Sequence, residues 1–486
     1  MSPAQIGFAI LVLGAFLIVG KLVRVKVKWV QRLFLPSSII AGALLLLLGP
    51  QVLGKLAGGS LAESGIFTPQ ILEVWGALPG LLISVVFATM FLGQDLPRFS
   101  RAVKLVGPQL SLGVALGSGQ YVVGLLLAIL VLVPFFSATP MVGALIEVGF
   151  EGGHGTAAGM RETFQSLGFD SGADLAVGLA TVGIVGGIVI GIGLINWGAR
   201  TGRTEFLSGQ VSASVEEQRG LFRRDEYYPA ATMTSRPASV EPLALHVAIC
   251  AVAILVGWAI LEALRWIESA TYGSTEIRDG VTLEIFGSVP LFPLALLGGV
   301  IVQAAAKALR VDHLIDHQMM LRIQGLALDF LIVSAIATLS ITAIGENLAT
   351  FLLLAVAGIA FTVAVFYFFA PKVIGRFWFE RAIGDFGQSM GVTATGLILM
   401  RITDPEAKSP AFEAFGYKQL VFEPFFGGGL VTAMAVPIIF FVGPWPLLIG
   451  MGILFLVATV GGLLAFGPTA RREHRERAAE LQRTPA

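Results

Sequence analysis

The chain of 486 residues contains one cysteine, Cys250, and only five histidines. A single cysteine cannot form a disulfide within the chain, and Cys250 lies in a long apolar run, so we do not expect thiol redox chemistry. Charge is also scarce, because Asp, Glu, Lys and Arg make up only 13% of the residues, and 32 basic residues balance 32 acidic ones. Without an excess of basic residues, the chain is not expected to bind nucleic acid.

Sequence motifs of enzymes are missing as well. The run 117–124 (GSGQYVVG) superficially resembles a nucleotide-binding loop, but no predicted strand precedes it. We find no P-loop and no nucleophile elbow. His313 and His317 have the helical spacing of a metal pair, but no third His or Cys ligand is evident. We therefore expect neither an enzyme nor an organic cofactor.

Hydrophobic residues, in contrast, make up 55% of the chain, and the mean hydropathy is +0.83. A helix needs about 20 mostly apolar residues to cross a bilayer, and about eleven runs approach or exceed that length. They are 6–22, 33–48, 78–92, 105–132, 173–197, 243–266, 286–305, 326–344, 348–369, 425–441 and 447–466. The first is followed by basic residues and not by a cleavage site, so we interpret it as a retained helix. The fold predicted is an all-α polytopic membrane protein.

The distribution of lysine and arginine predicts the orientation. Cytoplasmic loops carry the excess of basic residues, so the basic loop after the first run is expected in the cytoplasm and the N-terminus outside. The C-terminal tail is also basic and is expected in the cytoplasm; its arginines are Arg471, Arg472, Arg475, Arg477 and Arg483. The chain is thus expected to be a multi-pass protein of the cell (inner) membrane.

The chain divides into two similar halves. Residues 1–199 are expected to hold five helices with a re-entrant hairpin at about 141–162, and residues 243–442 a second such repeat with a hairpin at about 380–400. A polar stretch, 200–242, is interpreted as a cytoplasmic linker. An extra transmembrane helix at 443–468 and a tail at 469–486 follow. An odd number of helices in each repeat gives the two repeats opposite orientations, as in many secondary transporters.

Two glycine-rich stretches at equivalent positions, 151–160 and 387–397, look like copies. If Val392 is omitted, the run 155–159 (GTAAG) aligns with Gly391, Thr393, Ala394, Thr395 and Gly396. Irregular backbone at membrane depth is found where it is buried in protein or lines a cavity, which favours a substrate site. The alternative is that these glycines only permit close helix packing. That explanation suits Gly183, Gly187 and Gly191, which recur every four residues with no polar residue between them.

The hairpin tips would expose backbone N–H groups at the start of half-helices, where a carboxylate is favoured. We therefore expect substrate-binding residues in both stretches: Gly153, His154, Gly155, Thr156, Gly391, Val392, Thr393, Ala394 and Thr395. His154 has a second interpretation, in which a ring nitrogen bonded to a backbone carbonyl braces the loop.

Backbone and side-chain oxygens near the same stretches suit a hard cation such as sodium. The expected sodium ligands are Gly152, Gln388, Ser389, Asp329 and Gln120. Gln120 could instead join helices, and Asp329, one turn into its predicted helix, could reach the interface. Glu147 and Glu151 are expected at the outer mouth of the first hairpin, and Asp404 and Glu406 in the cytoplasmic interface.

Four runs resemble the bacterial sodium/glutamate symporter family: 149–159 (GFEGGHGTAAG), 34–42 (FLPSSIIAG), 385–397 (DFGQSMGVTATGL) and 401–406 (RITDPE). The resemblance implies sodium-coupled uptake of L-glutamate, inverted five-helix repeats with re-entrant loops, a mobile transport region against a scaffold, and a homodimer. The 200–242 insert and the extra C-terminal helix depart from the family pattern. The alternative is a sodium- or proton-coupled transporter of other dicarboxylates.

Overall fold

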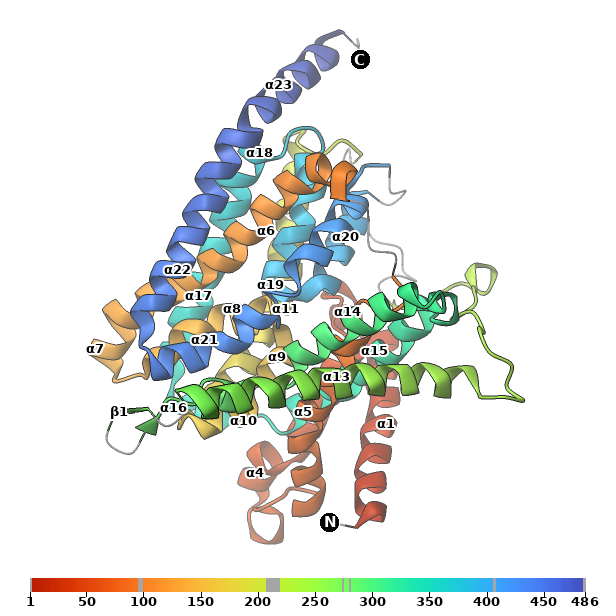
Figure 1. The fold of residues 1–486 in the computed structure, drawn as a ribbon, viewed down its shortest axis with the longest axis vertical. Helices are drawn as coiled ribbons and strands as arrows, with labels where there is room; N and C mark the ends of the chain where they lie inside the picture. Colours follow the sequence, from red (N-terminus) through yellow and green to blue (C-terminus); the bar gives the residue numbers. More distant parts are fainter. Residues whose placement is uncertain are drawn as a thin grey trace.

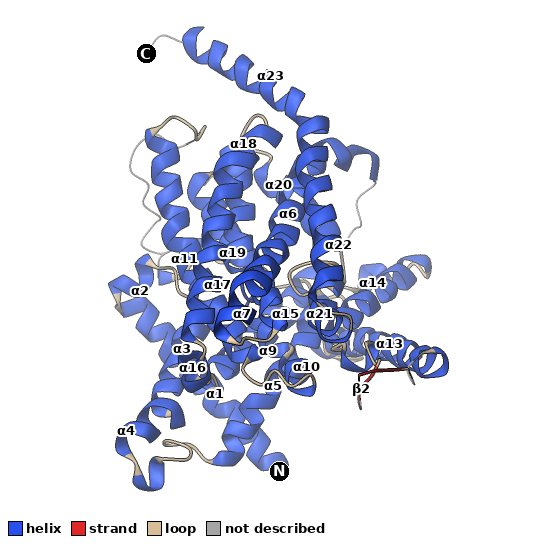
Figure 2. Ribbon diagram, turned by 90° about the vertical axis from the view of Figure 1, so that its left-hand side faces the viewer, coloured by secondary structure: helices blue, strands red, loops and turns tan. Residues whose placement is uncertain are grey.

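The computed structural model describes residues 2–94, 99–206, 219–272, 275–278, 281–404 and 408–483, which form a helical molecule (Figure 1, Figure 2). Its strands, β1 (Glu276–Arg278) and β2 (Val281–Thr282), make one short antiparallel ribbon. Within these ranges, nine helices are long and apolar enough to cross a membrane: Pro3–Lys26, Ser37–Ala57, Pro69–Thr89, Val106–Phe136, Gly172–Arg200, Pro242–Thr271, His317–Ala337, Leu348–Val373 and Pro444–Arg477. The chain is therefore a polytopic membrane protein.

Each of these nine helices overlaps one of the apolar runs expected from the sequence. The remaining two runs, 286–305 and 425–441, form shorter helices of 17 and 12 residues. The first is shortened because a turn precedes it and Pro293 stands at its start. The second is shortened by three successive glycines, of which Gly427 and Gly428 have φ of +68° and +107°. Helical backbone requires negative φ, so the helix cannot extend through them.

The first half of the chain forms α1 (Pro3–Lys26), α3 (Ser37–Leu48), α5 (Pro69–Thr89), α6 (Phe99–Leu127), α8 (Leu145–Phe150), α9 (Gly153–Gly159), α10 (Arg161–Ser166) and α11 (Gly172–Arg200). The second half forms α13 (Pro242–Thr271), α14 (Phe292–Ala308), α15 (His317–Ala337), α17 (Leu348–Ala364), α19 (Trp378–Thr403), α20 (Ala411–Phe422), α21 (Leu430–Phe441), α22 (Pro444–Leu456) and α23 (Gly462–Arg483). Residues 207–218 of the expected linker lie outside the described residues, as does Glu406.

The helices contact one another in two groups, and each group draws on both halves of the chain. In the first group, α5 packs against α15 and α14, α1 against α3, and α13 against α14. In the second group, α11 packs against α19 and α8, and α6 against α17, α20 and α22. The short helix α9 contacts α11 of the second group and both α5 and α15 of the first. It therefore lies where the two groups meet (Figure 1).

Glycines on α11 allow the close approach of α19. A Cβ atom at Gly183 would overlap the carbonyl oxygen of Met390, and one at Gly187 would lie 3.0 Å from the Met390 Cβ. Gly191 lies in the same way against the side chain of Leu399. The expectation that these three are packing glycines is confirmed. Their contacts hold α19, which carries the second glycine-rich stretch, close to α11.

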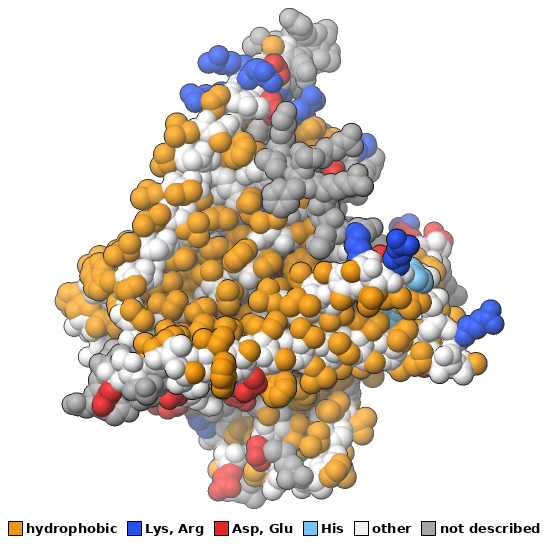
Figure 3. Space-filling model, in the orientation of Figure 1, with side chains coloured by type: hydrophobic (Ala, Val, Ile, Leu, Met, Phe, Trp, Pro, Cys, Tyr) orange, Lys and Arg blue, Asp and Glu red, His pale blue; other side chains and the backbone are white. Residues whose placement is uncertain are grey.

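The outer surface matches a lipid environment. Figure 3 shows hydrophobic side chains across a broad middle band, with most of the visible charged side chains toward the margins. Large apolar side chains of α13 and α22 are among those exposed, such as Trp258 and Ile449. A soluble protein seldom exposes so wide an apolar surface, but a bilayer covers it.

Candidate functional site

Both glycine-rich stretches interrupt helices. The first break separates α8 from α9 at residues 151–153, and Gly153 has φ of +68°, a conformation that glycine adopts without a steric penalty. The second lies within α19, where Gly391 (φ −158°, ψ 49°) and Val392 (φ 64°, ψ 168°) leave the helical conformation. A β-branched residue at positive φ is rare and strained, and strain of this kind clusters at functional sites. The residue omitted to align the two stretches, Val392, is thus part of the second break.

The two breaks touch each other. A Cβ atom added at Gly153 would overlap the side chain of Val392, and among the described residues no other part of the chain beyond its own helix and chain neighbours lies within 4 Å of that atom. Both α9 and α19 also pack against α11. Two stretches that are more than 200 residues apart in the sequence therefore lie in contact, and their meeting was expected from the sequence.

A third break, which the sequence analysis missed, adjoins the first. We predicted one continuous span over 425–441, but residues 423–429 instead form a loop between α20 and α21. Gly427 lies against Glu151, because a Cβ atom there would be 3.6 Å from the Glu151 Cγ. Gly428 lies against the hydroxyl of Thr156. Pro424 and the three glycines Gly427–Gly429 were the available signal, since both residue types interrupt helices.

Glu147 of α8 binds the third break through hydrogen bonds. Its side chain is fully buried and accepts three hydrogen bonds, from the Tyr121 hydroxyl at 2.5 Å, the Thr432 hydroxyl at 2.8 Å and the Gly427 N–H at 2.9 Å. Three hydrogen-bond donors offset the free-energy cost of burying this carboxylate away from water. The expectation that Glu147 lies at an outer mouth is wrong, because α6 and α21 cover its side chain. The position of Glu147 in the sequence, just before the loop, gave no indication of these contacts.

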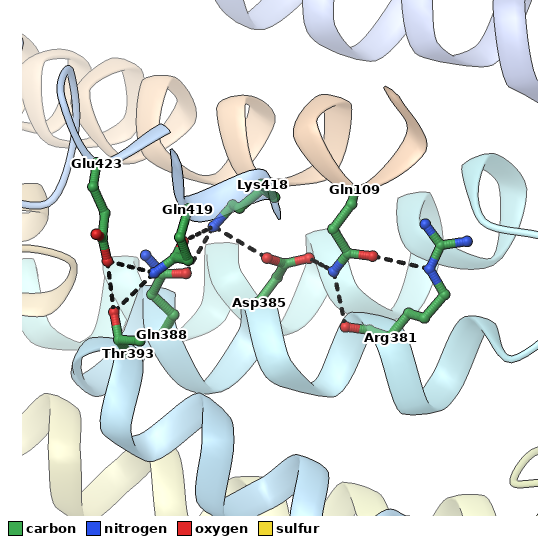
Figure 4. Close-up of polar contacts among 8 residues, drawn as sticks. All are labelled: Gln109, Arg381, Asp385, Gln388, Thr393, Lys418, Gln419 and Glu423. Carbon is green, nitrogen blue, oxygen red and sulfur yellow. Dashed lines mark hydrogen bonds and ion pairs between the residues drawn. The ribbon is translucent and has the colours of Figure 1, made fainter. Parts of the chain in front are cut away.

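A buried lysine, Lys418 of α20, organises a polar network beside the second break (Figure 4). Its Nζ lies 3.2 Å from Asp385 Oδ1 and donates to Gln388 Oε1 at 2.7 Å and to Gln419 Oε1 at 3.1 Å. The side chains of Lys418 and Asp385 are both completely buried. The Nζ also lies 4.0 Å from the centre of the Phe422 ring, a favourable cation–π distance. The ammonium is therefore fully coordinated within the protein.

The network continues in both directions from Lys418. On one side, Gln109 of α6 donates to Asp385 Oδ2 and to the Arg381 carbonyl, and the Arg381 Nε donates to Gln109 Oε1 at 3.1 Å. On the other side, Gln419 donates to Thr393 Oγ1 at 2.9 Å and to Glu423 Oε1 at 2.6 Å. Figure 4 shows these side chains in a row that runs from α6 across α19 to the end of α20. The second break is thus joined to α20 through Thr393.

The residues expected to bind substrate all lie at the first two breaks. Gly153, His154, Gly155, Thr156, Gly391 and Thr395 are buried, Val392 and Thr393 are half-buried, and Ala394 is exposed. His154 Nε2 lies 2.9 Å from the Thr181 hydroxyl on α11, so the ring braces the loop through a side chain and not through the expected backbone carbonyl. The Thr395 hydroxyl donates to the Gly391 carbonyl, and the Thr393 hydroxyl donates to Glu423 Oε1 at 3.1 Å. The Thr156 hydroxyl is buried and has no hydrogen-bond partner among the described residues.

The expected sodium ligands are only partly brought together. Gln120 Nε2 donates to the Ser389 carbonyl at 2.6 Å, so these two residues are adjacent, and Gly152 lies in the first break. The side-chain oxygen of Gln388 is occupied by the Lys418 ammonium. Asp329 lies in the middle of α15 beside Ser38, and no hydrogen bond joins it to a break within the described part of the chain. It was expected one turn into its helix, but α15 begins at His317.

The other candidates raised by the sequence have structural partners. Asp404 is buried and accepts hydrogen bonds from the N–H groups of Lys408 and Ser409 at 2.9 and 2.7 Å, just before α20. His317 Nδ1 lies 2.9 Å from the Leu92 carbonyl. Across the described ranges, no group of three His, Cys, Asp or Glu side chains could hold a metal ion.

An apolar pocket of about 250 Å³ lies between α1, α5 and α15, and no residue of the breaks lines it. It is lined by Ile10, Leu78, Leu82, Val85, Ile323, Leu326, Ala327 and Phe330. A charged or polar substrate would find no hydrogen-bonding side chain among these residues. The polar breaks, and not this pocket, are the candidate site.

A scan against protein-family models finds no matching family for this chain, and a search of curated proteins finds no similar sequence.

Proposed function

We propose that the protein is a sodium-coupled symporter of L-glutamate or a similar anionic amino acid. The observation that supports this proposal is the contact between the two helix breaks at Gly153 and Val392, in the region where the two helix groups meet. Discontinuous helices that meet at an interface between repeats are the usual substrate site of secondary transporters. Such a site is buried in protein, where the N–H and C=O groups of the irregular backbone can find hydrogen-bond partners away from lipid.

In this proposal the two halves are inverted repeats, and the breaks are the tips of re-entrant hairpins. The first helix group would be the scaffold and the second the mobile transport region, with α9 between them. The N-terminus would be outside, the C-terminus in the cytoplasm, and the functional unit a homodimer. Alternating access would then follow from movement of the second group against the first.

The substrate carboxylates would bind at the start of the half-helix after Val392 and at the backbone N–H groups of the first break, where the helix dipole favours negative charge. Thr393 and Thr156 would orient the substrate through their hydroxyls. Coupling requires that sodium and substrate each raise the affinity for the other.

The direct test of this function is uptake of radiolabelled L-glutamate into proteoliposomes. Replacing external sodium with potassium under an otherwise equal gradient is expected to lower the initial rate at least about fivefold, the lower end of typical coupling factors. Uptake that is indifferent to sodium would contradict sodium coupling. Competition by aspartate, citrate and succinate in the same assay identifies the substrate class.

Thr393→Ala is expected to raise the KM for glutamate about tenfold, since a hydrogen bond to a charged group contributes about 1.5–3 kcal/mol. The control is Thr403→Ala on the same helix, whose hydroxyl donates to the carbonyl groups of Leu399 and Met400 within that helix. Both variants are compared in the proteoliposome assay after confirming insertion and folding. An unchanged KM in Thr393→Ala would remove this side chain from the substrate site.

One observation favours the second candidate, a proton-coupled transporter of other dicarboxylates. The Lys418 ammonium occupies the amide oxygen of Gln388, which we expected to bind sodium. A resident positive charge reduces the need for a metal cation at that position. Uptake of a dicarboxylate driven by a pH gradient in the absence of sodium would support this candidate.

A further inference from the structure

Glu151 stands out among the buried carboxylates near the breaks. It is 3% exposed, and apart from the Ser389 hydroxyl that faces it, its carboxyl has no hydrogen-bond partner among the described residues. Glu147, one helical turn earlier, accepts three hydrogen bonds. An ionised carboxylate that is buried without partners is strongly unfavourable, so Glu151 must gain a cation or a proton. Packing alone therefore does not explain Glu151.

Three further buried oxygens near Glu151 lack a partner other than Glu151 itself within the described ranges. They belong to the Ser389 hydroxyl, the Thr156 hydroxyl and the amide of Gln120. The residues Ser389 and Gln120 are completely buried, and Thr156 is 1% exposed. Buried polar atoms are satisfied in the great majority of cases, so four such side chains in one region indicate a missing ligand.

These side chains come from the elements that converge at the breaks. Gln120 of α6 is hydrogen-bonded to the Ser389 carbonyl of α19 at 2.6 Å, and the Ser389 hydroxyl faces the Glu151 carboxyl. Gly427 of the third break lies against Glu151, and the next residue, Gly428, against the Thr156 hydroxyl. Glu151, which belongs to the first break, thus lies against residues beside the second break and in the third.

The donor atoms identify the class of ligand. A carboxylate, a hydroxyl and an amide oxygen are the ligands of hard cations, and no histidine or cysteine is among them. The charged groups that act on Glu151 are Lys418 of α20, Glu147 of α8 and Asp385 of α19. Lys418 is paired with Asp385 and already donates to two glutamines, so it does not neutralise Glu151 directly.

We propose that Glu151, the Ser389 hydroxyl and the Gln120 amide oxygen bind one sodium ion, with Thr156 at its edge. This inference rests on the proposed function, which it makes more specific. Glu151 replaces Asp329 as the charged ligand, and Gln388 leaves the ligand set because Lys418 holds it. The bound ion neutralises Glu151 at the point where the breaks meet, so sodium occupancy stabilises the contact on which substrate binding depends.

The test is calorimetric titration of the purified full-length protein with NaCl against a choline chloride background, without substrate. Glu151→Gln keeps the size of the side chain and removes its charge, and it is expected to weaken sodium binding at least about tenfold, since the charge of the ligand set governs cation affinity. The control is Glu162→Gln, which removes an exposed carboxylate from α10 and is expected to leave sodium affinity unchanged. Equal sodium affinity in wild type and Glu151→Gln would overturn the proposal.

A second variant covers the case in which Glu151→Gln does not fold. Ser389→Ala removes one neutral ligand and leaves the buried charge, and it is expected to weaken sodium binding about threefold to tenfold. Unchanged affinity in Ser389→Ala would count against the site. A wild type that binds no sodium but takes up a proton, measured with a pH-sensitive dye in weak buffer, would also overturn the sodium assignment.

Failure of the site and failure of the proposed function give different results. Sodium-dependent glutamate uptake with full sodium affinity in Glu151→Gln means that the function stands and the site is wrong. Sodium binding that depends on Glu151, in a protein that does not accumulate glutamate, means that the site stands and the substrate is wrong.

Discussion

Replacing Lys418 with methionine is expected to lower the free energy of unfolding by about 3–5 kcal/mol. The substitution preserves a long apolar side chain but leaves the carboxylate of Asp385 buried without its counter-ion. It also removes donors from Gln388 and Gln419, which line the second break. The measurement is the unfolding transition of the purified protein in detergent, followed by tryptophan fluorescence or by loss of monodispersity on heating.

Two comparisons isolate the charge effect. Lys372→Met removes an exposed lysine and is expected to change stability by less than about 0.5 kcal/mol. The double variant Lys418→Met/Asp385→Asn removes both charges and is expected to recover much of the loss, because no ionised group is left without a partner. If Lys418→Met proves as stable as Lys372→Met, the buried ion pair does not have the role assigned to it.

Gly183→Ala and Gly193→Ala, on the same helix, are expected to change stability in opposite directions. Gly183→Ala places a methyl group against the Met390 carbonyl oxygen and the Phe150 ring, so α11 and α19 must separate. Overpacking of this kind costs about 1–3 kcal/mol, and we expect the upper end because a backbone atom cannot rotate away. Gly193 has no neighbour within 4 Å, so alanine there is expected to stabilise the helix by up to about 1 kcal/mol.

The same detergent unfolding assay measures both variants. For the proposed transport function, Gly183→Ala is further expected to reduce glutamate uptake, since Met390 directly precedes the second break, whereas Gly193→Ala is expected to keep normal uptake. Equal stability of the two variants would mean that α11 and α19 tolerate a wider separation than the structure indicates.

Hydropathy and glycine content predicted much of the fold. Nine of the apolar runs are membrane-length helices in the described part of the chain, because a continuous apolar stretch long enough to cross a bilayer has few alternatives. The first two breaks were also found, since Gly152–Gly155 and the corresponding second stretch are too rich in glycine and polar residues for a regular lipid-facing helix. These are local properties, which a sequence displays directly.

Helix boundaries were predicted less well, with a consequence for Asp329. The residues 317–325 (HQMMLRIQG) are too polar to mark the start of an apolar run, yet they form the first turns of α15. Asp329 was therefore placed near a helix end and lies instead at mid-helix. Whether a polar helical turn is buried depends on the neighbouring helices, and a hydropathy profile contains no information about them.

The buried charges could not be assigned from the sequence, because their partners are distant along the chain. Lys418 pairs with Asp385, and Glu147 meets Gly427 and Thr432. Nothing in the local pattern around Lys418 or Asp385 indicates that the two side chains meet. Pro424 and the three glycines at 427–429 could have indicated the third break. The apolar residues on either side of them instead led to the prediction of one continuous helix.

The pairing of Lys418 with Asp385 has a consequence for the electrical behaviour of the protein. A unit charge that crosses a membrane potential of 100 mV gains or loses about 2.3 kcal/mol. The ammonium and the carboxylate lie 3.2 Å apart on helices of the same group, so any displacement of that group carries them together with no net charge. In the proposed alternating-access cycle this pair would be electrically silent, and a measured current would report the ions and substrate that accompany it.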